Sequence, residues 1–185
     1  MKFCSHCGSA ALQWRIPDGD TLPRFVCPDC GTIHYQNPKV VVGCLPIWED
    51  KLLLCRRAIE PRHGLWTLPA GFLENNETLE AGAMRETLEE ADARVAIDGL
   101  YVMISIVHVS QVYVMFRARL LDLDFGPGSE SLEVRLFAED EIPWETIAFR
   151  TITRTLRNYF LDRRDGAWPL RLSSIERSRL PLPAA

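Results

Sequence analysis

The chain contains 185 residues, of which 47% are hydrophobic and 25% are charged, and its formal net charge is −4. This length and composition suit one ordinary globular domain, with or without a small added module. The acidic balance gives no electrostatic sign of a nucleic-acid or membrane partner. No apolar run approaches the ~20 residues of a membrane span, and no apolar signal region opens the chain. We therefore expect a cytoplasmic protein with no membrane partner.

Four of the six cysteines form two pairs near the N-terminus, Cys4 with Cys7 and Cys27 with Cys30, and two residues separate the members of each pair. This spacing is typical of a zinc site built from four thiolates. A segment this short buries little apolar surface, so a bound metal would supply its folding free energy. We predict a zinc ribbon over residues 1–37, ligated by these four cysteines. Two disulfides are the alternative, which the absence of secretory signals disfavours.

The remaining cysteines and two nearby histidines are expected to be structural. Cys44 and Cys55 fall in apolar runs and are predicted to be buried small hydrophobes. His6 and His34 lie beside the cysteine pairs, but four thiolates already complete a structural zinc site, so neither histidine is expected to bind the metal.

Apolar runs rich in β-branched and aromatic residues predict the strands of a second domain. Residues 40–48 and 51–57 are expected to form one hairpin. Residues 94–109 and 111–121 are expected to form another. A loop with several glycines and prolines follows, and residues 134–138 then predict a further strand.

A helix is predicted over residues 79–91, which are rich in good helix formers. Thr78 is its expected N-cap, with Asn75 or Asn76 as alternatives. Four apolar residues recur at helical spacing and are expected to form the buried stripe: Ala81, Met84, Leu88 and Ala91.

Three carboxylates of this helix, Glu86, Glu89 and Glu90, share one face on the far side from Leu88. Like charges at this spacing repel by a few tenths of a kcal/mol. A divalent cation such as Mg²⁺, which prefers carboxylate oxygens, would relieve that repulsion. A solvated acidic face is the alternative interpretation.

The last part of the chain is expected to add a helix and a tail. Residues 145–161 predict the helix. Residues 166–185 are rich in proline and are expected to be irregular. The main domain is therefore expected to span residues 38–165.

The spacing of Gly71, Glu77, Arg85-Glu86 and Glu89-Glu90 reproduces G-x5-E-x7-R-E-U-x-E-E, the charged part of the Nudix box. The last positions depart from the pattern, because Thr87, Asp92 and Ala93 stand where it has a bulky apolar residue, a glycine and a bulky aliphatic residue. The chain resembles the Nudix hydrolases over roughly residues 3–161. The resemblance implies a Nudix α/β/α sandwich with a mixed sheet. It also implies an enzyme that cleaves a nucleoside diphosphate linked to another moiety.

The same resemblance implies roles for individual residues. Mg²⁺ or Mn²⁺ is expected to bind the box carboxylates and the carbonyl of Ala70. Glu77 and Arg85 are expected to form an ion pair that supports the ligands. A glutamate ahead of a later strand often adds a ligand or acts as the base; Glu133 fits that position and Glu130 competes with it. Glu89, which is either a ligand or holds the nucleophilic water, is the other option for the base. The ligands and catalytic residues implied are Glu77, Arg85, Glu86, Glu89, Glu90 and Glu133, with Ala70.

A zinc ribbon ahead of a Nudix domain also occurs in the NADH pyrophosphatases. Their downstream S-Q-P-W-P-F-P-x-S motif has no counterpart here, where the comparable pieces are Ala167-Trp-Pro-Leu170 and Ser173-Ser-Ile175. The chain is more similar to a short group that includes plant FAD and ADP-ribose pyrophosphatases. FAD or ADP-ribose is therefore the expected substrate, and AMP the expected product. NADH hydrolysis, RNA decapping and a non-catalytic nucleotide sensor are the alternatives. A homodimer is expected, and a nucleic-acid partner is disfavoured by the acidic balance.

Overall fold

The computed structural model describes residues 1–176 and divides the chain into two compact units, one of residues 1–37 and one that begins at Pro38. The first unit is a small antiparallel sheet with the order β1-β2-β3. Its strands are β1 (Gln13–Arg15), β2 (Arg24–Val26) and β3 (Ile33–His34). The cysteine pairs lie in two tight turns, in which the Gly8 amide donates to the Cys4 carbonyl and the Gly31 amide to the Cys27 carbonyl, both at 2.9 Å.

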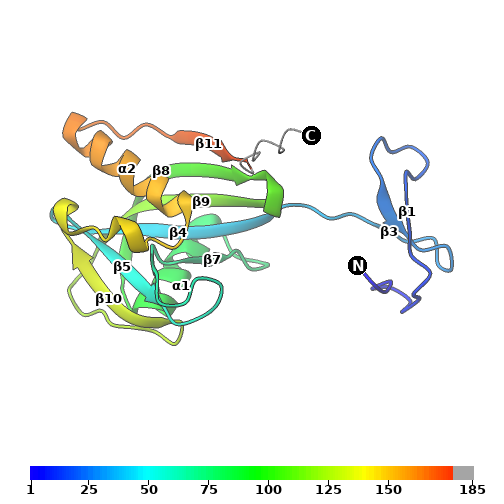
Figure 1. Ribbon diagram of the computed structural model, residues 1–185, viewed down its shortest axis with the longest axis horizontal. Helices are drawn as coiled ribbons and strands as arrows, with labels where there is room; N and C mark the ends of the chain where they lie inside the picture. The colour runs from blue at the N-terminus through cyan, green and yellow to red at the C-terminus, as the bar shows by residue number, and fades with distance from the viewer. Residues whose placement is uncertain (177–185) are drawn as a thin grey trace, which may run out of the picture. The chain divides into compact units, whose positions relative to one another are not determined.

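The second unit contains a large mixed sheet with the order β10-β5-β4-β9-β8-β11, in which β6 pairs with β5 and β7 with β4 (Figure 1). The β4–β9 and β8–β11 pairs are parallel, and the other pairs are antiparallel. The strands are β4 (Lys39–Trp48), β5 (Lys51–Arg57), β6 (Trp66–Thr67), β7 (Ala70–Phe72), β8 (Val95–Ile106), β9 (Gln111–Leu120), β10 (Ser131–Phe137) and β11 (Arg171–Ile175). Both predicted hairpins are confirmed.

The helices are α1 (Leu79–Ala91) and α2 (Arg150–Asp165), with short 3-10 turns η1 (Val107–Val109), η2 (Glu139–Glu141) and η3 (Trp144–Thr146). Alternate residues of β4 and β5 point to opposite faces of the sheet. Leu45 and Leu52 join the core cluster that contains Leu156 of α2, whereas Cys44 joins the cluster that contains Ala83 of α1. Figure 1 shows the two helices on opposite sides of the sheet. The predicted α/β sandwich with a mixed sheet is confirmed. In the described residues, 1–176, we find no helix with the length and apolar character that a membrane crossing requires.

Helix α1 has the predicted bounds, and the hydroxyl of Thr78 accepts a hydrogen bond from the Ala81 amide at 3.1 Å, as expected of an N-cap. The predicted apolar stripe is wrong in part, because Ala91 is buried and Ala81 is partly buried, but Met84 and Leu88 are not. Met84 and Leu88 are 38% and 48% exposed, whereas Glu86 and Glu90 are buried. The reason is that α1 turns Glu86 and Glu90 inward, where Arg85 donates a hydrogen bond to Glu86 and the Ala70 amide donates one to Glu90.

Helix α2 begins later than predicted, at Arg150 rather than residue 145. The cause lies in the preceding segment. The Ala148 amide donates to the Trp66 carbonyl at 2.8 Å, and Ile147 forms a parallel bridge with Trp66. This pairing holds residues 147–148 in an extended conformation, so the helix can start only after them.

The expected irregular tail is wrong in part, because residues 171–175 form β11, parallel to β8. The buried carboxylate of Asp162 holds this strand in place. It accepts hydrogen bonds from the Tyr101 hydroxyl at 2.6 Å and from Arg171 Nε at 3.1 Å. One ionic cluster thus ties α2, β8 and β11 together. The rest of the predicted tail, residues 177–185, lies outside the described part of the chain.

Candidate active site and zinc site

A cavity of about 690 Å³ opens beside β7 and α1. The box residues supply one wall of it, including Ala70, Glu86, Glu89 and Glu90. Strands β5 and β9 and the loop before β10 supply other lining residues. The structure therefore brings together the box carboxylates that the sequence predicted, in a space large enough for part of a nucleotide-sized ligand.

Gly71 on β7 lies against the side chain of Glu86 on α1. A Cβ atom at this position would overlap the carboxylate of Glu86. Because glycine has no side chain, the Glu86 carboxylate can lie directly against the backbone of β7. This close contact explains on steric grounds why a glycine occupies the first position of the box.

Arg85 organises three carboxylates at once. Its Nε and Nη2 donate to the two oxygens of Glu77 at 3.1 and 2.8 Å. Its Nη1 donates to Glu86 at 2.8 Å and to Glu89 at 2.9 Å. The bidentate pair with Arg85, with a further bond from the Glu74 amide, lowers the pKa of Glu77 to about 2. The predicted Glu77–Arg85 ion pair is present, and it fixes the box loop against α1.

The buried carboxyls of Glu86 and Glu90 receive less stabilisation of their charged form than Glu77 does. Burial raises the pKa of Glu90 to about 8, although the Ala70 amide donates to its carboxylate at 3.3 Å. Burial also raises the pKa of Glu86, against the opposing effect of Arg85. Two adjacent carboxyls that resist ionisation without a cation form a donor set that suits a hard divalent ion.

Two further glutamates were candidates, and the structure separates them. Glu130 lines the cavity and lies close enough to Glu86 and Glu90 to raise the pKa of each slightly. Glu133 lies on β10 opposite Arg56, with Arg56 Nη1 3.5 Å from its carboxylate, and is not among the residues that line the cavity. The geometry therefore favours the competing candidate, Glu130.

A cation and three aromatic rings also line the cavity. The guanidinium of Arg57 lies 5.2 Å from the ring centre of Phe149, and its Nε donates to the Pro61 carbonyl at 3.0 Å. Tyr113 on β9 and Phe72 on β7 also line the cavity. Sequence reasoning missed the three rings, because they reach the cavity only through the pairing of β7 with β4, of β4 with β9, and of residues 147–148 with Trp66.

The positions that depart from the box pattern close the end of α1. Asp92 adopts the left-handed conformation that a glycine would take, with φ of 46°, and its amide donates to the Leu88 carbonyl. Thr87 is buried, and its hydroxyl donates to the Ala83 carbonyl at 2.8 Å. Ala93 is buried too.

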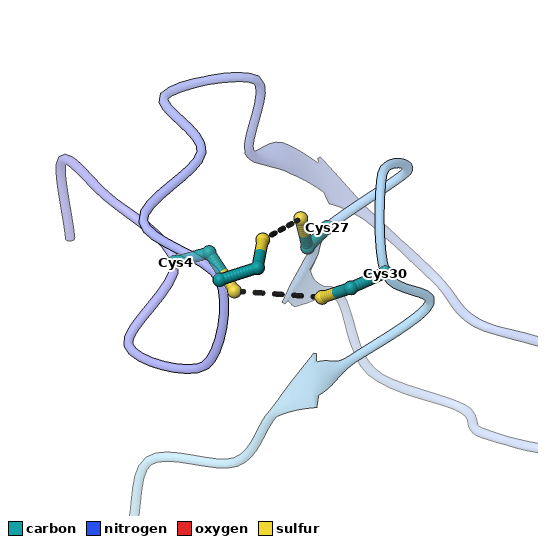
Figure 2. Close-up of side chains that lie close together, drawn as sticks. Cys4, Cys27 and Cys30 are labelled. Carbon is teal, nitrogen blue, oxygen red and sulfur yellow. Dashed lines mark hydrogen bonds between the residues drawn. The ribbon is translucent and has the colours of Figure 1, made fainter.

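The four predicted zinc cysteines converge, with all four sulfurs within 4.8 Å of one another. Cys4 Sγ lies 3.7 Å from Cys30 Sγ, a pair that can be followed in Figure 2. Cys7 Sγ lies 3.6 Å from Cys27 Sγ. A tetrahedral ion with Zn–S bonds of about 2.3 Å places its sulfurs about 3.8 Å apart. The separations suit zinc, and they exceed the roughly 2.05 Å of the alternative disulfides.

The other two cysteines are buried, as predicted, and one of the nearby histidines contacts the four-sulfur group. Cys44 and Cys55 are buried in the core. His34 is buried, and its Nε2 lies 3.3 Å from Cys4 Sγ. This contact places His34 beside the four-sulfur group, where it can donate a hydrogen bond to a thiolate.

Two known sequence families match the chain in succession. Residues 2–36 match the zinc-ribbon family described as Nudix N-terminal, and residues 37–156 match the NUDIX domain. A NUDIX hydrolase structure from Nitrosomonas europaea is 63% identical and covers 96% of this chain and 100% of its own, with a TM-score of 0.92. An ADP-ribose pyrophosphatase structure from Streptococcus suis is 23% identical over 74% of this chain and 99% of its own, with a TM-score of 0.59, and shows a shared fold.

Curated relatives of the chain are named for hydrolysis of NAD-capped RNA. The NAD-capped RNA hydrolase NudC of Pseudomonas aeruginosa is 29% identical over 90% of this chain and 58% of its own length. That of Photobacterium profundum is 36% identical over 51% of this chain and 34% of its own length. The chain thus spans between about a third and somewhat over half of these relatives. With the box geometry, the ribbon and both family matches in agreement, the chain belongs to the Nudix family of hydrolases.

Proposed function

We propose that this protein hydrolyses the pyrophosphate bond of a nucleoside diphosphate derivative, with FAD or ADP-ribose as substrate and AMP as a product. The observation that carries the proposal is the cavity itself. It is lined both by the buried carboxyls Glu86 and Glu90 and by Arg57, whose guanidinium lies over the ring of Phe149. A diphosphate needs cations for its oxygens, and a nucleoside needs an aromatic or apolar wall.

We propose Mg²⁺ or Mn²⁺ as the ion that the carboxyl cluster holds, through Glu86, Glu89, Glu90 and the carbonyl of Ala70. A divalent ion supplies charge neutralisation of the diphosphate oxygens and a lowered pKa for a bound water. Glu130 takes the additional role first assigned to Glu133, because Glu130 faces the cavity. A structural Zn²⁺ on Cys4, Cys7, Cys27 and Cys30 belongs to the same proposal.

The chain's own residues do the positioning. Arg85 forms an ion pair with Glu77 and also orients the carboxylates of Glu86 and Glu89. Arg57 offers its guanidinium to the diphosphate, where it would stabilise negative charge that develops on a leaving phosphate. Glu130 and Glu89 are the two carboxylates proposed to receive the proton of the attacking water.

The placement of the C-terminal segment favours FAD or ADP-ribose over a nicotinamide dinucleotide. Trp168 stacks on Tyr159 with ring centres 5.3 Å apart, and the Arg117 guanidinium lies 4.0 Å from its centre. Residues 171–175 pair with β8. The two segments that most nearly match the nicotinamide motif, residues 167–170 and 173–175, therefore make packing and strand contacts within the fold. Trp168 is not among the residues that line the cavity. The relatives named NAD-capped RNA hydrolase make NAD-capped RNA the second candidate.

The test is a hydrolysis screen of FAD, ADP-ribose, NADH and NAD-capped RNA with and without Mg²⁺. We expect Mg²⁺-dependent AMP release from FAD or ADP-ribose. Turnover of NAD-capped RNA alone would replace the substrate assignment. Nucleotide binding without any turnover would support the sensor alternative and contradict the proposal. Size-exclusion chromatography with light scattering tests the proposed homodimer.

A matched pair of variants tests the choice of carboxylate. Glu130→Gln removes a charge at the cavity, whereas Glu133→Gln removes one at the Arg56 pair on β10. We expect turnover to fall by at least about 10-fold in Glu130→Gln, on the scale of a lost supporting group at a metal site. Glu133→Gln is expected to stay within about twofold of the wild type. The reverse ranking would return the role to Glu133.

A further inference from the structure

The loop between β9 and β10, residues 121–130, contacts the C-terminal end of α1. The last four carbonyls of any helix lack partners within the helix. In α1, the Gly126 amide donates to the Ala91 carbonyl at 2.9 Å, and the Gly128 amide donates to the Glu90 carbonyl at 3.1 Å. The loop thus supplies backbone donors to the helical turn that carries two of the box carboxylates.

The approach at Gly128 is closer than any other residue type allows. A Cβ atom at this position would overlap the carbonyl oxygen of Glu89 and press on the carbonyl carbon of Glu90. Backbone atoms of a helix cannot move aside as a flexible side chain can. A side chain at residue 128 would therefore separate the loop from α1 or displace the helix end.

The same loop delivers Glu130 to the cavity. The Ser131 amide donates to the Gly128 carbonyl at 3.1 Å, and the Ala58 amide donates to the Glu130 carbonyl at 2.8 Å. The backbone on both sides of Glu130 is thus tied, at one end to the loop on α1 and at the other to the end of β5. The position of Glu130 relative to Glu89 and Glu90 depends on these few hydrogen bonds.

We propose that Gly128 is a positioning residue, whose contact with the last turn of α1 fixes Glu89 and Glu90 relative to Glu130 and so sets the geometry of the carboxylate cluster. This inference rests on the proposed function, since the cluster matters for catalysis only if it holds the divalent ion. Gly128 touches no reacting atom. It acts through the backbone of the residues that do.

The same loop contains a matched control. Apart from its chain neighbours, no described residue lies within 4 Å of a Cβ atom built on Gly126. Gly126→Ala keeps the backbone amide that bonds Ala91 and adds a methyl group in open space. Gly128→Ala adds the same methyl group against the Glu89 carbonyl. Both substitutions reduce the flexibility of the loop similarly, so a difference between them reports the contact with α1.

The experiment compares Mn²⁺ affinity, measured by isothermal titration without substrate, and the kcat and KM of the wild type and both variants. For Gly128→Ala we expect Mn²⁺ binding and kcat to fall by about 10- to 100-fold, the range for residues that orient metal ligands. KM is expected to change little, because the aromatic wall of the cavity lies on other elements. Gly126→Ala is expected to match the wild type. Equal values in all three proteins, or equal losses in both variants, would overturn the proposal.

Hydrogen exchange on the wild type covers the case in which Gly128→Ala does not fold. The Gly126 and Gly128 amides are expected to exchange as slowly as the amides of the last turn of α1. A freely exchanging Gly128 amide would overturn the proposal without any variant. If the wild type hydrolyses no diphosphate, the proposed function fails, while the Mn²⁺ affinities still decide whether Gly128 positions the carboxylates.

Discussion

The two helices of the main domain differ in the large side chains that they bury. Helix α2 buries apolar and aromatic residues, among them Ile152, Leu156 and Phe160, against one face of the sheet. Helix α1 buries Glu86 and Glu90 and leaves Met84 and Leu88 exposed. One helix lowers the free energy of the fold through apolar burial. The other spends stability on charged groups that only a function requires.

The difference shows in how each helix is held. Apolar contacts hold α2 over most of its length. Specific polar contacts hold α1 to its surroundings: Arg85 to Glu77, the Ala70 amide to Glu90, and loop amides to its last carbonyls. Such contacts fix side-chain positions more narrowly than apolar packing does. The comparison predicts that variants of α1 change activity and variants of α2 change stability.

The largest effect is expected for Glu90→Gln. The amide keeps the shape of the side chain but cannot carry the charge that a divalent ion requires. We expect kcat/KM to fall by at least about 100-fold in the presence of saturating Mg²⁺, in line with the loss of a group that stabilises transition-state charge. Steady-state kinetics on the substrate that the screen identifies measures the change. Circular dichroism that matches the wild type is the control, and unchanged turnover in the folded variant would remove Glu90 from the site.

In α2 the matched change is Leu156→Ala. Leu156 is fully buried in the core cluster on the other face of the sheet. The cavity left behind is expected to lower the free energy of unfolding by about 2–5 kcal/mol. Urea denaturation measures the loss. Turnover per folded molecule is expected to remain near that of the wild type, and a selective loss of kcat would show that the two helices are not independent.

The sequence predicted α1 well because local chemistry fixes its ends. Thr78 satisfies the first turn, and Asp92 adopts the left-handed conformation at the last. The buried face could not be predicted from apolar spacing, because Gly82 and Ala83 approach the sheet closely while Met84 and Leu88 remain outside. Periodicity assumes that apolar residues turn inward, and a functional helix need not obey it.

Residues joined only by tertiary contacts were the ones that sequence reasoning missed. The start of α2 depends on the pairing of Ile147 with Trp66. Strand β11 depends on a buried carboxylate at Asp162, far along the chain from Tyr101. The candidate site was predictable where the box spacing is local. Glu130 and Glu133 are so close in sequence that only the register of β10 on β5 separates them.

A smaller effect on activity is expected for Arg85→Lys. Arg85 makes two parallel bonds with Glu77 while it also holds Glu86 and Glu89. A lysine retains the positive charge but cannot bridge these partners with a planar fork. We expect kcat to fall by about 10- to 100-fold, with Mn²⁺ affinity lowered in parallel. If Arg85→Lys keeps full activity, charge alone suffices and the bidentate geometry has no catalytic role.

The smallest effect concerns stability against pH in the metal-free protein. Burial raises the pKa of Glu90 from 4.5 to about 8 in the folded state. Between these pH values the folded state binds more protons than the unfolded state, so the free energy of unfolding falls as pH rises. We expect the melting temperature of the protein in EDTA at pH 8 to be lower than at pH 5 by several degrees, with Zn²⁺ retention in the ribbon confirmed by metal analysis.

Glu90→Gln separates this effect from other titrations. The variant has no carboxyl to ionise at this position, so its melting temperature is expected to fall less between pH 5 and pH 8 than that of the wild type. Adding Mg²⁺ is expected to stabilise the wild type more at pH 8 than at pH 5, because binding displaces the proton that the buried carboxyl holds at low pH. Parallel curves for the two proteins would mean that Glu90 is ionised in the folded state without a metal. Burial of Glu90 on α1 would then not lower the stability of the fold. The energetic contrast with α2, which is stabilised by apolar burial, would not hold.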